Sequence, residues 1–232
     1  MRIKFVQKVI DILRGKKRNC LNIDNFMQFN DIRINENVRA NVDLNIIGKN
    51  NKIIINTDAI IGKLNLKIFG DNNYILIDEN VSVSSGLFIL IGKNHPNFGK
   101  VCNSKLEIHK DTSIESLEYI TYNSNTFCVI EEQCMLSYGI LIYNTDGHPI
   151  FDKDTGELLN KPRGITIGKH SWIGMKATIL KNSIVPCNSI IACNAVYACG
   201  SRGGLIAYLQ VIRQKLSKKI LIGMQMATNM AI

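Results

Sequence analysis

The segment from Tyr143 to Pro149 (Tyr-Asn-Thr-Asp-Gly-His-Pro) holds the residues best suited to chemistry. His148 can accept a proton near neutral pH, and Asp146, two positions earlier, can fix the tautomer of the imidazole and raise its basicity. Pro149 restricts the backbone directly after the histidine. A lone histidine in a loop is more often an ordinary surface residue, but this combination favours a general base. No cysteine lies beside His148 in the sequence, so a cysteine nucleophile is the weaker interpretation.

The residues after this segment follow a repeat that predicts its support. Large aliphatic residues recur every six positions, and a small residue follows each of them by four. An α-helix would need spacings of three and four, and a flat strand a spacing of two. A period of six fits short strands separated by turns, with three hexads in a coil of about 18 residues, so we expect an all-β, parallel β-helix. The aliphatic positions are Ile167, Ile173, Ile179, Val185 and Ile191, and the small ones are Ser171, Ala177, Ser183, Ser189 and Ala195.

A looser repeat precedes this one. Three similar segments, Ile47–Asn51, Phe69–Asn73 and Ile91–His95, are spaced by 22 residues, and each contains glycine followed by asparagine. Aliphatic alternation comes before each segment. Because glycine and asparagine tolerate positive φ angles, we expect wider coils of the same β-helix with these residues at the corners.

The segment with His148 lies in a long interruption of the repeat. A polar stretch follows Pro149, and the aliphatic pattern resumes at Ile165. Long loops that leave a regular scaffold tend to carry function. We therefore expect a protruding loop over residues 144–164.

Composition and charge narrow the class of protein. The chain has 232 residues, 46% of them hydrophobic and 20% charged, which excludes an intrinsically disordered chain. The net charge of +9 comes from the ends, since residues 1–18 carry seven Lys and Arg against one acid and residues 202–232 carry five against none. A nucleic-acid binder would more often carry its basic residues across its body, so we expect no nucleic-acid partner. The basic N-terminus fits either two solvated ends or peripheral contact with an anionic membrane.

The charge pattern and the repeat divide the chain into three parts. Residues 1–18 place Val6, Val9, Ile10 and Leu13 on one helical face, which predicts a basic helix that caps the first coil. Residues 19–201 form the β-helix domain. Residues 202–232 form an irregular C-terminal segment in which the hexad pattern stops.

The seven cysteines form no Cys-x-x-Cys pair and are odd in number. Residues 1–15 are charged throughout and do not resemble a signal peptide. We therefore expect reduced thiols in a cytoplasmic protein, at the inner face of the membrane if the basic end binds lipid, and we expect no metal site.

Three segments together carry a resemblance to a known family: Asn144-Thr-Asp-Gly-His-Pro-Ile150, Lys161-Pro162 and Ile167-Gly-Lys-His-Ser-Trp-Ile-Gly174. They resemble the hexapeptide-repeat acyltransferases, which fold as left-handed parallel β-helices. Within that group the sequence is most similar to O-acetyltransferases of capsule or O-antigen sugars, including those that modify sialic acid polymers. The resemblance is specific over about residues 128–198, weaker over 41–127 and absent at both extremities. It implies a left-handed β-helix, a homotrimer, acetyl-CoA as co-substrate and no metal.

The resemblance also implies roles for individual residues. His148 would take the proton from a sugar hydroxyl, with Asp146 or a backbone carbonyl holding its other nitrogen, and transfer would be direct. Trp172 would line both the donor and the acceptor sites. The other residues are expected to contact the ligands. For the sugar these are Asn144, Lys161 and Tyr197; for the pantetheine arm of coenzyme A they are Gly174, Lys176, Ala177, Ala192, Asn194 and Ala195; and Lys181 is assigned to a phosphate.

The C-terminal segment departs from the family. A segment of the form I-A-G-x-P-A-K is expected after the last coil, but this chain reads Ile206-Ala-Tyr-Leu-Gln-Val-Ile212. A one-base slip at Lys218-Lys219 would restore an ending closer to that of the family. We therefore hypothesise that the gene is frame-disturbed in this region, which the nucleotide sequence can test.

Three other functions stay open from the residues alone. A base histidine would serve an N-acyltransferase acting on an amino-sugar nucleotide equally well. A non-catalytic β-helical binding protein would need no base. A zinc β-helix of the carbonic anhydrase kind needs three converging histidines, and the sequence offers only His95, His109, His148 and His170.

Overall fold

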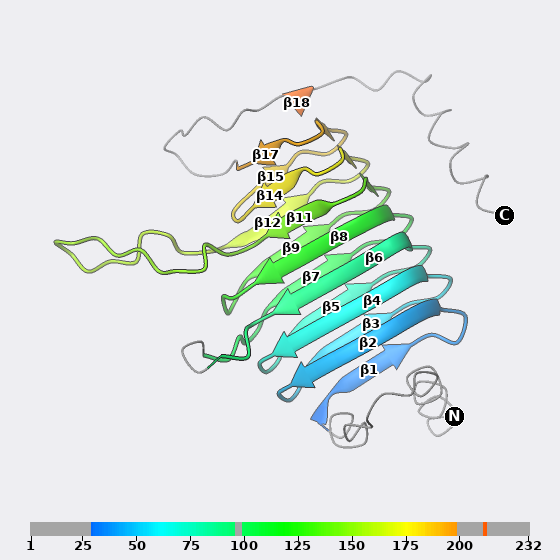
Figure 1. Ribbon diagram of the computed structural model, residues 1–232, viewed down its shortest axis with the longest axis horizontal. Coiled ribbons are helices and arrows are strands. Elements are labelled where there is room, and N and C mark those ends of the chain that lie inside the picture. Colours follow the sequence, from blue (N-terminus) through cyan, green and yellow to red (C-terminus); the bar gives the residue numbers. More distant parts are fainter. Residues whose placement is uncertain (1–28, 96–98, 199–210, 213–232) are drawn as a thin grey trace.

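The computed structural model describes residues 29–95, 99–198 and 211–212, and all of its labelled elements are strands (Figure 1). Successive turns of the chain stack on one another and form two sheets. The seven-stranded sheet contains β1 (Asp31–Ile34), β3 (Lys52–Ile55), β5 (Tyr74–Ile77), β7 (Lys105–Ile108), β9 (Phe127–Ile130), β12 (Gly164–Ile167) and β15 (Ile184–Val185). The eleven-stranded sheet contains β2 (Arg39–Ile47), β4 (Ile60–Phe69), β6 (Ser82–Ile91), β8 (Ser113–Thr121), β10 (Met135–Leu136), β11 (Ile140–Tyr143), β13 (Trp172–Ile173), β14 (Thr178–Leu180), β16 (Ile190–Ile191), β17 (Val196–Tyr197) and β18 (Val211–Ile212).

The strands pair in parallel from one coil to the next, as the hexad repeat predicts. Ile167 pairs with Val185, Ile173 with Ile191, and Ile179 with Tyr197. Each of these partners lies 18 residues further along the chain, so three hexads make one coil. The expectation of an all-β, parallel β-helix is confirmed.

The core is a column of aliphatic side chains between the sheets. Every large residue of the hexad repeat is buried, and so are four of its five small residues, Ser171, Ala177, Ser183 and Ser189. Burial of aliphatic area is the main favourable term in folding, and alternation along each short strand puts one residue in two into this column. The small residues lie at the corners, where the chain turns around the core.

The two ends of the β-helix are built differently. The strands β2, β4, β6 and β8 are long, with nine or ten residues each, and the register shifts between Ile61 and Leu64 in β4 and between Val83 and Gly86 in β6. From the next coil onward, two short strands replace each long one, and both β10 and β11 pair with β8. A bend in the early coils thus becomes a turn in the later ones.

Buried asparagines connect the early coils. The Asn51 amide donates to Asn30 Oδ1 and the Asn73 amide to Asn51 Oδ1, each at 2.9 Å. The ladder continues into Ser104, whose N–H donates to Asn73 Oδ1 at 2.9 Å. The spacing of 22 residues would continue to His95, but Tyr74 pairs with Lys105 in the next coil, so Ser104 takes the position after Asn73.

Several expectations concern residues that lie outside this description. The helix over residues 1–18 is one of them, and the segment 202–232 is described only at Val211–Ile212, where β18 pairs antiparallel with β16. The described coils begin at Asp31 and continue to Tyr197, within the domain predicted over residues 19–201. In the described residues no helix has the length and apolar character needed to cross a bilayer.

Candidate active site

The loop that carries His148 leaves the β-helix between β11 and β12 (Figure 1). Its two arms run antiparallel, with a bridge between Phe151 and Leu158. At the tip, the Asp152 carboxylate accepts hydrogen bonds from the backbone N–H groups of Thr155 and Asp154 and from the Thr155 hydroxyl, and these hydrogen bonds lower the pKa of Asp152. The protruding loop is thus an ordered hairpin.

Asp146 fixes the base of this loop to the β-helix. Lys181, from the next coil, places its Nζ 2.7 Å from Asp146 Oδ2, and its side chain is only 16% exposed. The same Nζ donates to the carbonyl oxygen of Asn160 at 2.9 Å. Lys181 therefore holds the outgoing and the returning arm of the loop together.

Asn160 completes this contact from the returning arm. Its Nδ2 donates to Asp146 Oδ2 at 2.7 Å and to the His148 carbonyl oxygen at 2.9 Å. Its Oδ1 accepts the N–H of Ile150 at 2.8 Å. We call Asp146, Asn160 and Lys181 the loop clip, because together they fix the backbone on both sides of His148.

The clip leaves the His148 ring exposed. Gly147, at φ 77°, turns the chain between Asp146 and His148 in a conformation that favours glycine. Among the described residues, no side chain makes a hydrogen bond or ion pair with the imidazole. The Asp146 carboxylate makes no hydrogen bond or ion pair with the ring in the described structure, where its Oδ2 binds Lys181 and Asn160. Asp146 positions the backbone of His148 instead.

Trp172 lies at a different place on the coil. It begins β13, is 42% exposed, and donates its indole N–H to Ser137 Oγ at 3.1 Å. Through the register it aligns with Ser113, the first residue of β8, whereas Tyr143, the last residue before the loop, aligns with Ile120. Seven residue steps along β8 separate these positions, up to about 23 Å at 3.3 Å per residue.

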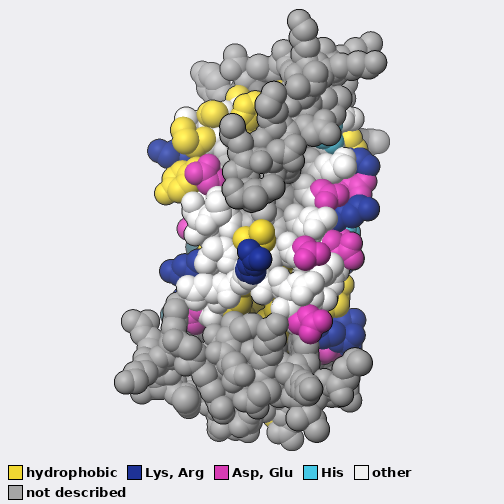
Figure 2. Space-filling view, turned by 90° about the vertical axis from the view of Figure 1, so that its right-hand side faces the viewer, with side chains coloured by type: hydrophobic (Ala, Val, Ile, Leu, Met, Phe, Trp, Pro, Cys, Tyr) yellow, Lys and Arg dark blue, Asp and Glu magenta, His cyan; other side chains and the backbone are white. Residues whose placement is uncertain are grey.

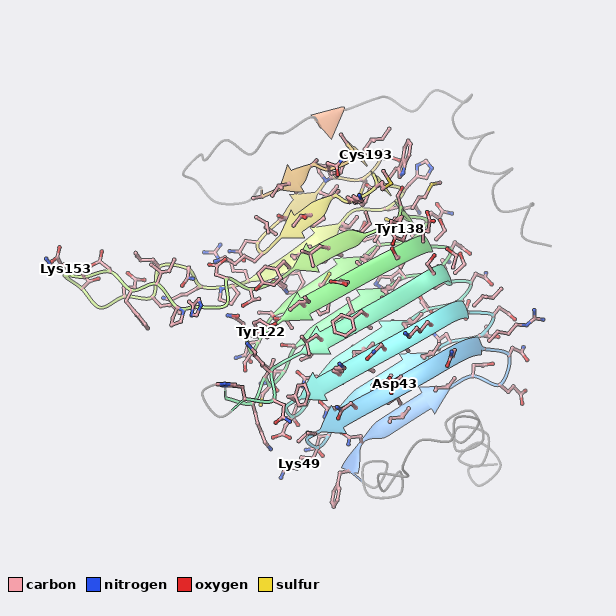
Figure 3. All side chains as sticks on the ribbon, in the orientation of Figure 1. Asp43, Lys49, Tyr122, Tyr138, Lys153 and Cys193 are labelled. Atoms are coloured by element: carbon pink, nitrogen blue, oxygen red, sulfur yellow. The ribbon has the colours of Figure 1, made fainter. Side chains whose placement is uncertain are left out.

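The figures show the same separation. The loop tip at Lys153 and the corner at Tyr138, next to Ser137, lie on opposite sides of the molecule in Figure 3. One chain therefore does not bring His148 and Trp172 together.

Four of the predicted contact residues are buried and need correction. Asn144 is fully buried and donates to the carbonyl oxygen of Phe127, and Tyr197 is 4% exposed and donates its hydroxyl to the Ile184 carbonyl. Ala177 is also fully buried. Their side chains fill the core and offer no surface to a sugar or to coenzyme A. Gly174 is buried as well, and a Cβ there would lie 2.7 Å from the backbone nitrogen of Cys193, so it is a glycine because the next coil packs against it.

The remaining predicted contacts divide by exposure. Lys176 and Asn194 are exposed on neighbouring coils, and the Asn194 N–H donates to the Met175 carbonyl. Ala192 and Ala195 are half-buried beside them. Lys161 is exposed in the loop and pairs with Glu157 at 3.2 Å. Lys181 is engaged in the clip, so its assignment to a coenzyme A phosphate is not supported.

The sequence did not point to Asn160 or Ser137. Asn160 lies in a polar stretch without periodicity, where nothing marks one asparagine above another. Ser137 directly follows Leu136 and lies outside the small positions of the hexad repeat, and its contact with Trp172 spans 35 residues and depends on coil stacking.

Thiols and metal ligands do not form a second site in the described part of the chain. The five cysteines within it are free, and burial raises the pKa of Cys128 above its usual range and that of Cys134 to about 11. These two thiols therefore stay protonated near neutral pH. No group of three or more His, Cys, Asp and Glu side chains among those residues is placed to hold a metal ion.

Two proteins of named activity are similar to this chain in sequence. No family model matches the chain. The polysialic acid O-acetyltransferase of Neisseria meningitidis is 31% identical over 145 residues, which are 60% of this chain and 59% of that protein. The enzyme of the same name from Escherichia coli O1:K1 / APEC is 30% identical over 98 residues, 40% of this chain and 31% of that protein. The resemblance to polysaccharide O-acetyltransferases is confirmed.

The similarity has a defined extent. The chain spans about three fifths of the length of the first of these relatives and less than a third of the second. Among solved structures, the polySia-specific acetyltransferase NeuO superposes with a TM-score of 0.52 at 23% identity, over 76% of this chain and 87% of that one. At that identity the likeness shows the β-helical fold.

Proposed function

We propose that this protein transfers an acetyl group from acetyl-CoA to a hydroxyl of an acidic cell-surface polysaccharide. The observation that carries the proposal is the loop clip, which fixes the backbone of an exposed histidine on a protruding loop of an acetyltransferase-like β-helix. The two curated relatives, both named polysialic acid O-acetyltransferases, support the choice of acceptor. An N-acyltransferase has no comparable support.

The reaction needs one base and one set of hydrogen-bond donors. Neutral His148 takes the proton of the sugar hydroxyl while that oxygen attacks the thioester carbonyl carbon. Backbone N–H groups stabilise the oxyanion that develops on the carbonyl oxygen. The C–S bond then breaks, and the imidazolium returns its proton to the departing thiolate of coenzyme A. The products are the sugar acetate ester and free coenzyme A, and no acyl-enzyme forms.

The exposed edge at Trp172, Lys176 and Asn194 suits the acetyl-CoA arm. Trp172 and Lys176 lie four residues apart in one coil, and Asn194 lies on the next coil, where its N–H donates to the Met175 carbonyl. The Trp172 indole is fixed by Ser137. An indole face and an amide suit a pantetheine chain, which is apolar with amide groups along it, and Lys176 suits a phosphate. Acetyl-CoA supplies the activated acyl group when it is bound there.

His148 and this edge meet only if a second subunit contributes one of them. The loop exposes Ile150, Phe151 and Leu159, three large apolar side chains close to His148. Apolar side chains grouped on a protruding loop favour contact with another copy of the chain. We propose a homotrimer with cyclic symmetry, in which each loop reaches the edge of the next subunit.

Two measurements test this function. Purified protein, acetyl-CoA and polysialic acid should yield O-acetylated polymer by mass spectrometry, and the His148→Ala protein should not. Light scattering should show a trimer in solution. A stable monomer with full activity would contradict the shared site, and absence of transfer to any hydroxyl of the polymer would contradict the proposed reaction.

A further inference from the structure

A groove of about 560 Å³ lies on the outer surface of the eleven-stranded sheet, at the corner below Trp172. It forms where β4 and β6 bend at their register shifts and where the turn after β10 projects above them. Its volume is within the range of small-molecule sites, about 300–1,000 Å³. None of the residues assigned so far to the base, the clip or acetyl-CoA lines it.

Two aromatic side chains line this groove. Tyr138, in the turn between β10 and β11, is 49% exposed. Phe88, on β6, is half-buried and points outward between Asn65 on β4 and Glu118 on β8, with which it is in register. Aromatic faces are apolar platforms with a negative quadrupole, and they suit the C–H faces of a pyranose ring.

The polar groups around these rings suit the rest of a sugar. The amide of Asn65 and the carboxylate of Glu118 can bond to hydroxyl and N-acetyl groups in both directions. Lys63 is exposed at the rim, and Lys67 places its Nζ 5.6 Å from the centre of the Phe88 ring. Two ammonium groups near an aromatic floor fit a sugar that carries a carboxylate.

The groove is directly connected to the edge assigned to acetyl-CoA. Trp172 donates to Ser137, the residue before Tyr138, and the Lys176 N–H donates to the Tyr138 carbonyl at 2.8 Å. Figure 2 shows the side of the molecule on which Tyr138 lies in Figure 3, and much of its described surface is uncharged, with a basic side chain near the middle and acidic and basic side chains at both sides. A ligand in the groove therefore lies one coil from the donor.

We propose that this groove binds a unit of the acidic polysaccharide acceptor, with Tyr138 and Phe88 stacking on the sugar and Lys63 pairing with its carboxylate. The inference rests on the proposed function for the identity of the acceptor. It adds a binding site on wide coils that the hexad repeat does not reach, and it gives Tyr138 and Lys63 a role in acceptor affinity rather than in proton transfer.

Direct binding separates this proposal from the reaction. Isothermal titration calorimetry of the full chain with an oligomer of sialic acid, without acetyl-CoA, should show binding that Tyr138→Ala weakens by roughly two- to tenfold, the size of one aromatic contact. Tyr138→Phe, which keeps the ring, should bind as the wild type does. Lys63→Met should weaken binding more at low salt than at high salt, because its contribution is electrostatic. Tyr74→Ala, on the other sheet, is the matched control and should change nothing.

Steady-state kinetics gives the second readout. In Tyr138→Ala the KM for the polymer should rise while the KM for acetyl-CoA and kcat stay within about twofold, since a ground-state contact is lost. If Tyr138→Ala and Lys63→Met are active and their oligomer binding and KM for the polymer are unchanged, the groove is not the acceptor site. The proposed function would then still stand. If the oligomer binds and Tyr138→Ala weakens that binding, but no acetyl transfer is detected, the acceptor site is supported and the proposed reaction is overturned. A wild-type protein that does not bind the oligomer would overturn the groove.

Discussion

The wide coils are formed by β1 to β8 and the regular coils by β12 to β17. The two kinds of coil enclose the core with strands of different length and with different residues at their corners. The wide coils use long strands with bends and a buried ladder of asparagines, whereas the regular coils use two-, three- and four-residue strands with small residues at tight corners. Wide coils leave outer surface that can be hollowed, and the groove lies on it. Regular coils stack turn upon turn, so Lys176 and Asn194 lie at equivalent turns of two successive coils, and Trp172 lies on the strand before Lys176.

The junction between these two regions carries the candidate chemistry. The long strand type ends at β8, the first split pair is β10 and β11, and the protruding loop follows directly. Tyr138 and His148 both belong to this one coil, and the tip of the loop at Lys153 lies on the opposite side of the molecule from Tyr138 (Figure 3). A change of coil type thus supplies a groove, an edge and a loop within a short distance along the axis, and each of the following predictions tests one of these parts.

Replacing His148, in the loop at this junction, should have the largest effect on activity. His148→Ala should lower kcat by about 10²–10⁴-fold, because the sugar hydroxyl loses its proton acceptor in the transition state. The acetyl-CoA Kd should change little, since the imidazole does not hold the thioester. Near-normal turnover of His148→Ala would leave the fold unaffected and exclude this mechanism.

The wide coils should depend on their polar ladder more than the regular coils depend on their corner hydroxyls. Asn73→Ala removes the donor to the Val101 carbonyl and the acceptor for the Ser104 N–H, both at 2.9 Å. Leaving these buried groups unpaired should lower the free energy of unfolding by about 2–4 kcal/mol. Urea denaturation followed by circular dichroism measures it.

Ser189→Ala is the matched control in a regular coil. The described structure provides no hydrogen-bond partner for the buried Ser189 Oγ, so its loss should change the stability by no more than about 0.5 kcal/mol, in either direction. Equal destabilisation by Asn73→Ala and Ser189→Ala would show that the two coil types are stabilised in the same way.

Substitutions in the loop clip should lower kcat, whereas substitutions at the edge assigned to acetyl-CoA should raise the KM for acetyl-CoA. Lys181→Met removes the cation that fixes Asp146 and Asn160, and a displaced base should lower kcat by about 10–100-fold with little change in KM. Lys181→Arg should retain part of the activity, because it keeps the charge. Lys176→Met, the control on the edge, should raise the KM for acetyl-CoA and leave kcat nearly unchanged. If Lys181→Met instead raises only the KM for acetyl-CoA, Lys181 contacts a phosphate and the clip is not its role.

Trp172 should show the smallest effect on the chemical step. Trp172→Ala removes an exposed indole and its hydrogen bond to Ser137, so the KM for donor or acceptor should rise by a few-fold to tenfold with kcat nearly preserved. Trp172→Phe should keep most of the contact surface. Steady-state kinetics with each substrate varied in turn separates the two, and a loss confined to kcat would assign Trp172 to the transition state.

Much of the fold and part of the site could be predicted from local residue patterns. The spacing of Ile167, Ile173 and Ile179 requires one inward position in six, and only a β-helix turns the chain at that rate, so the regular coils follow from the repeat alone. The protruding loop follows from the break in that repeat after Tyr143. His148 stands out by its chemistry and its neighbours in the sequence.

The contacts between coils could not be predicted, because they depend on which residues stack. Asp146 lies two positions from His148 in the sequence, yet its carboxylate binds Lys181 and Asn160, which the closed coil brings to it. Asn144 and Tyr197 look polar enough for a ligand, but the turn of the strand directs them inward. The groove at Tyr138 and Phe88 depends on strand bends that no local pattern marks. The sequence by itself determines the repeat, the loop and the reactive side chain, since each is encoded by neighbours along the chain. The partner of each charge and the shape of the surface are decided by tertiary structure, since both depend on residues such as Asp146 and Lys181, or Phe88 and Tyr138, that are far apart in the sequence and meet only when the chain folds.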